Sequence, residues 1–346
     1  MKNRKELILK EIVDQYIQTG EPIASKALLE EYDLDFSSAT IRNEMNTLEK
    51  EEYIKKPYTS GGRIPTIKGY RYFVNWLIEL AELRKEEKQE IINSYKFERQ
   101  DANQLIKITA SLLSNITGYL GFVLSPNLEE ARLENVNLVS LDNDNVMAIL
   151  VTEWGLLEGK TIKLEKAISA GELEEINIKL NQRLKGKKMM ELRSLENLDL
   201  DQSGWYDKTI RDSLYLVKKV LAPSPRRRLH VEGILNLLER ISPEESNDLV
   251  QLRKALRFLQ EKKDLEDFTG DCVKEDAKIN AMIGIGDSQE AMDYSIITKK
   301  LPECQMALGV LGPVRMDYSK TLSIVNYIGN RVGTLLSLGN LENTRN

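Results

Sequence analysis

The sequence has little of the chemistry that most enzymes and metal proteins need. Its 346 residues contain one histidine and two cysteines. The single imidazole, His230, cannot build a zinc site of several histidines, and it lies in a basic run rather than in a nucleophile motif. Cys272 and Cys304 cannot form a disulfide framework, so two reduced thiols are expected, with a redox switch as the alternative.

Several motifs and segment types are also missing. We find no phosphate-binding loop, no nucleophile elbow and no dinucleotide fingerprint, so we expect no catalytic residues, no cofactor and no metal site. No apolar run is long enough to span a membrane, and the N-terminal MKNRKELILKEI contains acidic residues, unlike a secretory signal. We therefore expect a cytoplasmic protein without membrane contact.

The composition is that of a globular chain with more than one domain. Hydrophobic residues make up 41% of the sequence and charged residues 30%, and the formal net charge is −5. A chain of this length is expected to fold as two or three domains. Because the overall charge is negative, a nucleic-acid partner would have to be indicated by a local basic surface.

Residues 36–76 are the most informative stretch, and they begin with a capped helix. Ser37 or Ser38 can cap a helix that runs to about Lys50, because a serine hydroxyl accepts a hydrogen bond from an amide of the first turn. At about 100° per residue, one face carries Ile41, Met45 and Leu48, and the opposite face carries Ala39, Arg42, Asn43 and Asn46.

The polar face of this helix is suited to reading DNA. Arginine pairs with guanine, asparagine pairs with adenine, and an alanine methyl group can pack on thymine. The set therefore matches readout of the major groove by the N-terminal half of a recognition helix. The alternative is an ordinary amphipathic helix whose polar face is only solvated, and the helix alone does not decide between them.

The segment after the helix predicts a wing. Residues 53–57 indicate a strand, residues 58–62 a glycine-containing tip, and residues 63–66 a returning strand. Between residues 53 and 75 every charged side chain is basic, namely Lys55, Lys56, Arg63, Lys68 and Arg71. This local basic surface supports contact with phosphates. With helices expected at 4–19 and 25–32, the stretch predicts a winged helix-turn-helix.

The same residues resemble a known family. SSATIRNEMNTLEK, followed by YTSGGRIPTIKGYRYFV, is similar to the N-terminal signature of HrcA, the repressor of bacterial class I heat-shock genes. ILKEIVDQYIQTGEPIASKAL and LGVLGPVRMDYSKTLSIVNYI resemble the same family, so the likeness covers the whole chain, although the middle is less distinctive. The resemblance implies a non-enzymatic repressor of chaperone operons, which binds an inverted-repeat operator in double-stranded DNA as a homodimer and is assisted by the GroE chaperonin.

The remainder of the chain predicts further helices and strands. We expect a helix from Ile67 to about Leu83, followed by a charged helical connector that joins neither neighbouring core. Helices are expected from residue 101, from Ser169 with Glu172 completing a capping box, and at 206–222, 242–260 and 318–337. Strands are expected at 119–124, 132–141, 145–154, 157–164, 229–234, 279–285, 294–301 and 305–311, the second to fourth of them as an antiparallel meander.

The order of these elements predicts an α+β protein of several domains, one inserted into another. The resemblance implies this arrangement, with a GAF-like domain that carries an inserted α+β dimerisation domain. The expected parts are a winged-helix DNA-binding domain at 1–82, a helical connector at 83–100, a GAF-like domain at 101–126 and 225–346, and the inserted dimerisation domain at 127–224.

These observations define a candidate DNA-binding set and one rival interpretation. The expected DNA-binding residues are Ser38, Ala39, Thr40, Arg42, Asn43, Asn46, Lys55, Lys56, Tyr58, Thr59, Ser60, Arg63, Lys68 and Arg71. A ligand pocket has little support in the sequence, because residues 284–316 contain no convergent polar or metal-binding set. The rival interpretation is nevertheless a ligand-responsive or redox-responsive sensor with a GAF-like pocket and DNA binding as its output. Operator binding by reduced, ligand-free protein would discriminate between the two.

Overall fold

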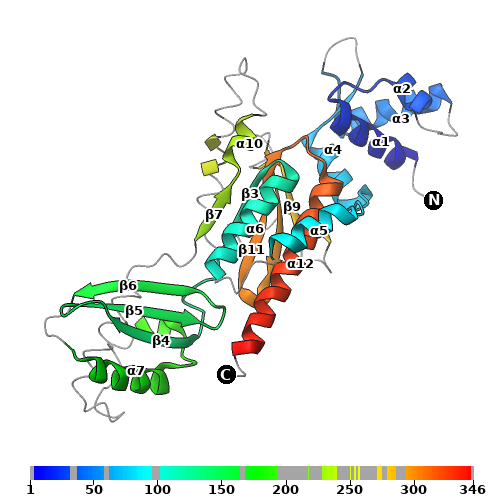
Figure 1. The fold of residues 1–346 in the computed structure, drawn as a ribbon. Helices are drawn as coiled ribbons and strands as arrows, with labels where there is room; N and C mark the ends of the chain where they lie inside the picture. Colours follow the sequence, from blue (N-terminus) through cyan, green and yellow to red (C-terminus); the bar gives the residue numbers. More distant parts are fainter. Residues whose placement is uncertain are drawn as a thin grey trace.

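The chain folds into an N-terminal unit of helices with a two-stranded wing and two further units, each built on a larger sheet (Figure 1). The structure is a computed structural model, and it describes residues 4–31, 37–57, 62–95, 102–163, 168–193, 217, 228–239, 250, 253–254, 256–257, 271–274, 279–285 and 294–343. The wing tip at 58–61 lies outside the described residues. The helices expected at 206–222 and 242–260 lie outside them except for isolated positions.

Three helices form the base of the N-terminal unit. They are α1 (Arg4–Thr19), α2 (Ser25–Glu31) and α3 (Ser38–Lys50). The predicted inward face of α3 is confirmed, because Ile41, Met45 and Leu48 are buried in the same cluster as Ile8 and Ile12 of α1. α1 ends at Thr19, and the φ of 75° at the following Gly20 lies in the left-handed region that favours glycine.

A two-stranded wing follows the third helix. β1 (Ile54–Lys55) and β2 (Ile64–Pro65) pair antiparallel, with Ile54 opposite Pro65 and Lys55 opposite Ile64. Ile54 is buried and Lys55 is exposed, so the wing is fixed through one face and presents the other to solvent. The predicted hairpin is confirmed for the strands.

The helix after the wing is shorter than predicted. α4 (Ile67–Tyr72) continues only as a π-helical turn, η1 (Phe73–Leu77), and Ile78 is extended. The backbone beyond it bonds to the start of the last helix instead. The Ser319 hydroxyl donates to the Glu79 carbonyl at 2.5 Å, and the Ala81 amide donates to the Ser319 carbonyl at 3.5 Å. These tertiary bonds replace the helical bonds that were expected as far as Leu83.

The prediction that the charged connector joins neither core is wrong. Its helix is α5 (Lys85–Ser94), and Ile91 is completely buried in the cluster that also holds residues of α6 and α12. Glu87 is 7% exposed and forms an ion pair with Lys320 of α12 at 2.9 Å. The many charges of this segment conceal a short inward-facing row, which the sequence pattern alone does not reveal.

A six-stranded antiparallel sheet forms the centre of the molecule. Its strand order is β7-β3-β11-β10-β9-β8. The strands are β3 (Leu120–Leu124), β7 (Leu229–Glu232), β8 (Asp271–Lys274), β9 (Ile279–Ile283), β10 (Tyr294–Leu301) and β11 (Met306–Pro313). Strand β8 was not predicted, and β7 adds to the edge beside β3 although about a hundred residues separate them in the chain. The elements before and after the middle block therefore share one sheet.

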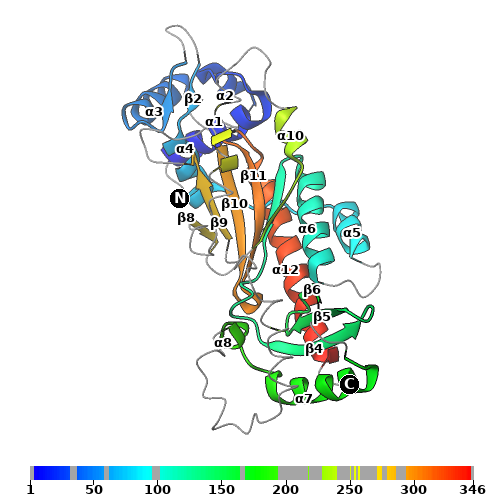
Figure 2. The same ribbon diagram turned by 90° about the vertical axis from the view of Figure 1, so that its left-hand side faces the viewer.

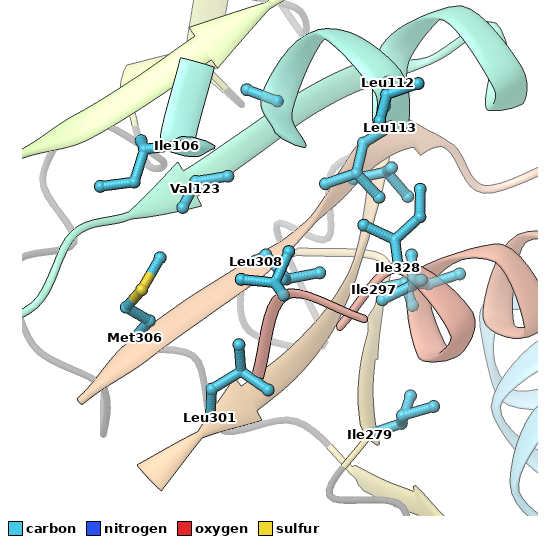
Figure 3. Packing of buried hydrophobic residues seen from close by; sticks show 14 of the residues in the cluster. Ile106, Leu112, Leu113, Val123, Ile279, Ile297, Leu301, Met306, Leu308 and Ile328 are labelled. Atoms are coloured by element: carbon cyan, nitrogen blue, oxygen red, sulfur yellow. The ribbon is translucent and has the colours of Figure 1, made fainter. Parts of the chain in front are cut away.

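Two helices cover one face of this sheet. α6 (Ala102–Thr117) and α12 (Tyr318–Asn343) lie side by side along it (Figure 2). Ile106 and Leu113 of α6 and Ile328 of α12 pack against Val123 and Leu308 of the strands (Figure 3). A second cluster, which includes Phe122, Ile296 and Leu311, lies on the other face, where the short helix α10 (Ile234–Leu238) contributes Leu237.

The predicted antiparallel meander forms a separate three-stranded sheet. It consists of β4 (Leu133–Ser140), β5 (Asn145–Thr152) and β6 (Leu157–Lys163) in that order. One face packs on α7 (Ala170–Leu184), which the Ser169–Glu172 capping box begins as predicted. The short helix α8 (Met189–Arg193) follows. Among the described residues, no helix has the length and apolarity needed to cross a membrane.

Candidate nucleic-acid interface

A serine cap fixes the start of the candidate recognition helix. The Ser37 hydroxyl accepts a hydrogen bond from the Thr40 amide at 3.2 Å, and the two hydroxyls lie 2.9 Å apart. Ser37 has extended backbone angles, so it is the N-cap and Ser38 is the first helical residue. The cap leaves Ser38 exposed at the end of the helix where backbone amides point outward.

The predicted base-reading residues lie together on the exposed face of α3. Ala39, Arg42, Asn43 and Asn46 are all exposed, whereas Thr40 is half-buried and engaged in the cap. Within the part of the chain that the structure describes, the Arg42 side chain forms no ion pair. This face therefore offers one guanidinium, two amides and a methyl group to a partner, as the sequence pattern predicts.

The wing is tied to this helix by an arginine. Arg63 Nη2 lies 2.7 Å from Glu49 Oε2, and Arg63 Nε donates to the same oxygen at 2.9 Å. The Arg63 amide and carbonyl also pair with Ile23, both at 2.8 Å. The guanidinium donates to Asn46 Oδ1 at 3.3 Å. Arg63 thus has structural contacts that the sequence did not indicate, and its role at DNA stays a prediction.

The lysines of the candidate set differ in their surroundings. Lys55 is exposed on β1. Lys56 forms a long ion pair with Glu49, with 3.7 Å between Lys56 Nζ and Glu49 Oε1. Lys68 donates to the Glu51 carbonyl at 2.8 Å and lies 4.7 Å from the centre of the Tyr53 ring. Because an exposed ion pair contributes only about 0 to 1 kcal/mol, the contact with Glu49 holds Lys56 weakly. Lys55 and Lys56 are therefore the wing lysines most available to a phosphate.

Arg71 is directed toward the six-stranded sheet. Its Nε donates to the Ile283 carbonyl at 2.9 Å and its Nη2 donates to the Gly284 carbonyl at 3.2 Å. It therefore stands apart from the other basic residues of the candidate set, which surround α3 and the wing. Tyr58, Thr59 and Ser60 of the set lie outside the described residues, so their positions are not compared with the prediction.

Two contacts that sequence reasoning missed hold α1 to the other end of this surface. Lys5 forms an ion pair with Glu51 at 2.7 Å, and the hydrogen bond to this carboxylate raises the pKa of Lys5. The Tyr72 hydroxyl donates to Glu6 at 2.8 Å, which raises the pKa of Tyr72 to about 12. The partners are separated by 46 and 66 residues, so no local spacing signal could have paired them.

The described residues provide little for a metal or redox centre. They contain no group of three or more His, Cys, Asp or Glu side chains arranged to hold a metal ion. Cys304 is 4% exposed, and its thiol lies 3.6 Å from the Leu301 carbonyl.

A crevice of about 970 Å³ lies between the wing and the end of β11, and its lining includes Lys55, Ile67 and Val314.

Comparisons with known proteins agree on one family. Residues 103–322 match the family model described as HrcA protein C terminal domain. The heat-inducible transcription repressor HrcA of Pelotomaculum thermopropionicum is 32% identical over 96% of both chains. The repressors of the same name from Halalkalibacterium halodurans and Limosilactobacillus reuteri are 32% and 34% identical, over 97% and 93% of both chains. A crystal structure described as a hypothetical protein is 25% identical, with a TM-score of 0.65 over 98% of this chain and 99% of that chain.

Proposed function

Because the chain belongs to the HrcA family of heat-inducible transcription repressors, we propose that it represses transcription by placing α3 in the major groove of an operator. The chain is a transcription repressor and not an enzyme. The observation that supports this binding mode best is the exposed face of α3, which carries Arg42 and Asn43 and to which the wing is tied through Glu49.

The two parts of this surface would have different tasks. Arg42 can donate two hydrogen bonds to a guanine, and Asn43 or Asn46 can pair with an adenine, so these residues would read base edges. Lys55 and Lys56 would contact phosphates, which fix the position of a protein on DNA without reading its sequence. Ser38, Ala39 and Thr40 would approach the DNA at the N-terminus of α3, where backbone amides attract a phosphate. Arg63 and Lys68 belong to the same proposed surface.

We propose that two copies associate through the open face of the three-stranded sheet. On this face Val139 lies opposite Met147, and Val151 lies opposite Leu157. Val139 is 40% exposed and Leu157 is 38% exposed, although both are large apolar side chains. Ile149 lies between these two pairs on the same face, so the face carries apolar side chains along β5. An apolar sheet face of this kind is typical of a self-association surface.

The backbone groups at the outer edge of β4 are already hydrogen-bonded. This favours a contact between the faces of two sheets over pairing of their β4 edges. Asn181 of α7 accepts a hydrogen bond from the Val136 amide at 2.9 Å and donates to its carbonyl at 2.7 Å. Asn177 does the same at Leu138, at 2.8 and 3.0 Å. These two amides occupy the backbone groups that another strand would need. A homodimer formed through the open face would bind an inverted repeat.

The remaining parts of the proposal follow from the family. The division into domains at 1–82, 83–100, 101–126 with 225–346, and 127–224 is proposed with the inserted part as the dimerisation domain. We propose operators in front of chaperone operons, a cytoplasmic location where bacterial DNA lies, and assistance by the GroE chaperonin.

Refolding the chain with and without chaperonin tests this assistance. If the chaperonin assists folding, more operator-binding dimer should form in its presence at heat-shock temperatures.

Footprinting on the DNA upstream of the chain's own gene tests the function. Purified, reduced protein without added ligand should protect two half-sites related by a two-fold axis and separated by about 10 base pairs or a multiple of that distance. Protection that requires a small molecule or an oxidant would instead support the sensor interpretation. No protection under any of these conditions would contradict both.

A further inference from the structure

Arg71 joins the N-terminal unit to the six-stranded sheet through two donors on one edge of its guanidinium, Nε and Nη2. It lies in the last turn of α4, and it donates to the Ile283 carbonyl at 2.9 Å and to the Gly284 carbonyl at 3.2 Å. These two carbonyls lie at the end of β9. A guanidinium can donate to two acceptors at once in a fixed geometry, whereas a lysine ammonium is a flexible point charge.

Arg71 contacts the sheet at Gly284, where α4 and the backbone after β9 lie very close together. Gly284 has a φ of 62°, and a Cβ atom there would collide with the Ile67 side chain of α4. Gly284 is therefore suited both by its backbone conformation and by its lack of a side chain. Ile67 and Arg71, four residues apart on one face of α4, fit around this glycine together.

A second arginine spans the same junction in the opposite direction. Arg315 belongs to the turn between β11 and α12, and its guanidinium lies directly against Gly20 at the C-terminus of α1. A cation is favourable at this end of a helix, where the carbonyl groups carry partial negative charge. The N-terminal unit thus extends an arginine to the sheet, and the sheet unit extends an arginine to the N-terminal unit.

Buried hydrogen bonds connect the two docking points. The Gly284 amide donates to the Ser295 hydroxyl at 3.4 Å, and this hydroxyl lies 3.0 Å from the Tyr318 hydroxyl. Tyr318 in turn donates to the Val314 carbonyl at 2.7 Å, next to Arg315. The Tyr70 ring of α4 lies 6.1 Å from the Tyr318 ring. Ser295 and Tyr318 are at most 1% exposed, so this hydrogen-bond path is buried. Arg71 and Arg315 lie at its margin, where both line the crevice beside the wing.

We propose that Arg71 is a positioning residue for DNA binding, which holds the winged-helix unit at a fixed orientation on the six-stranded sheet and does not contact phosphate. Arg315 has the same role from the sheet side. The inference rests on the proposed DNA-binding function and changes the role that the sequence suggests for Arg71. In a homodimer, this junction fixes the distance between the two copies of α3.

A fixed distance between recognition helices has a measurable consequence. Two rigidly held helices bind well only to half-sites with the matching separation, because a mismatch of one base pair moves and rotates one half-site. Helices on loosened units have a lower effective concentration at the matching half-site and a higher one at wrong separations. Loss of the junction should therefore reduce discrimination among operators that differ only in spacer length.

Four variants of the full-length chain separate positioning from phosphate contact. Arg71→Ala removes both the charge and the two hydrogen bonds, and Arg71→Lys keeps the charge but loses the paired donors. Arg315→Gln disturbs the junction from the opposite side, at a residue outside the candidate DNA-binding set. Lys55→Ala is the control, since it removes a proposed phosphate contact that makes no bond across the junction among the described residues.

Binding is measured on operators with the native spacer and with one or two base pairs added, over a range of salt concentrations. We expect Arg71→Ala, Arg71→Lys and Arg315→Gln to lower the affinity ratio of native to altered spacers about threefold to tenfold. Their dependence of log affinity on log salt should match that of the parent. Lys55→Ala should keep the ratio and reduce the salt slope by about one for each protomer.

The opposite pattern would overturn the inference. If Arg71 contacts phosphate, Arg71→Ala will reduce the salt slope as Lys55→Ala does, Arg71→Lys will behave like the parent, and the spacer ratio will not change. A parent protein that fails to bind any operator would contradict the proposed function instead. Hydrogen exchange then tests the junction without DNA: residues 62–77 and 279–285 should exchange faster in the Arg71 variants than in Lys55→Ala, and equal exchange would exclude the contact as a clamp.

Discussion

Arg63 of the wing and Glu49 of α3 form a two-point ion pair at the edge of the proposed DNA-binding face. Arg63 Nη2 and Nε lie 2.7 and 2.9 Å from Glu49 Oε2. The same guanidinium donates to Asn46 Oδ1 at 3.3 Å, so one arginine orients a predicted base reader while its own charge is balanced. The helix and the wing are consequently aligned before DNA binds.

This pair predicts that Glu49 limits the affinity for DNA. Glu49→Gln keeps an oxygen that can accept from Arg63 but removes a negative charge beside Arg63 and Lys56 on the proposed DNA-binding surface. We expect DNA affinity at low salt to rise about threefold to tenfold, on the order of 1 kcal/mol, and the gain to disappear at high salt. Fluorescence anisotropy over a salt series measures this. Glu82→Gln makes the same charge change at an exposed site outside α3 and the wing, and an equal gain there would contradict the local explanation.

If the open face of the three-stranded sheet is the dimer contact, charged substitutions on it should give a monomer. Val139→Glu combined with Leu157→Glu places two carboxylates on the proposed contact surface, where they would be buried without partners. We expect this variant to be a folded monomer at micromolar concentration by light scattering. Ile178→Glu is the matched control, because Ile178 is 54% exposed on α7, which packs on the other face. A dimer that survives the double substitution would place the contact elsewhere.

We predict that the free energy of unfolding falls in acid as Glu87 becomes protonated. Hydrogen bonds from Arg84 and Lys320 lower its pKa from 4.5 to about 2. Since the folded-state pKa is below the unfolded one, Glu87 stabilises the fold above pH 4.5, and this contribution is lost as the pH falls toward 2. We expect the loss to be about 1 to 3 kcal/mol. Urea unfolding of the parent and of Glu87→Gln should show a smaller decrease across this pH range in the variant, and parallel curves would contradict the assignment.

The sequence predicts the local elements of this fold well, because their signals are local. The apolar row of α1, the Ser169 capping box and the strand run at 294–301 each act within a few residues. The exposed face of α3 is also predictable, since three buried residues at helical spacing determine which side points outward. The family resemblance then supplies a function that composition and spacing do not provide.

Contacts between distant segments are what the sequence could not indicate. Charge alone places Arg71 with the DNA-binding residues, yet its hydrogen-bond partners are 212 and 213 residues away. The helix expected to reach Leu83 ends early because Glu79 and Ala81 bond to Ser319. Strand β8 has a short sequence with little apolar alternation, and it forms through pairing with β9.

Substitution of Arg42 tests most directly whether α3 reads the operator. The affinity of Arg42→Ala is compared with that of the parent on the footprinted operator and on random DNA of equal length, at one salt concentration. Loss of a guanine contact should cost about 1 to 3 kcal/mol on the operator and leave binding to random DNA nearly unchanged. An equal weakening on both DNAs would show that Arg42 contacts only the backbone, and would contradict base readout by this residue.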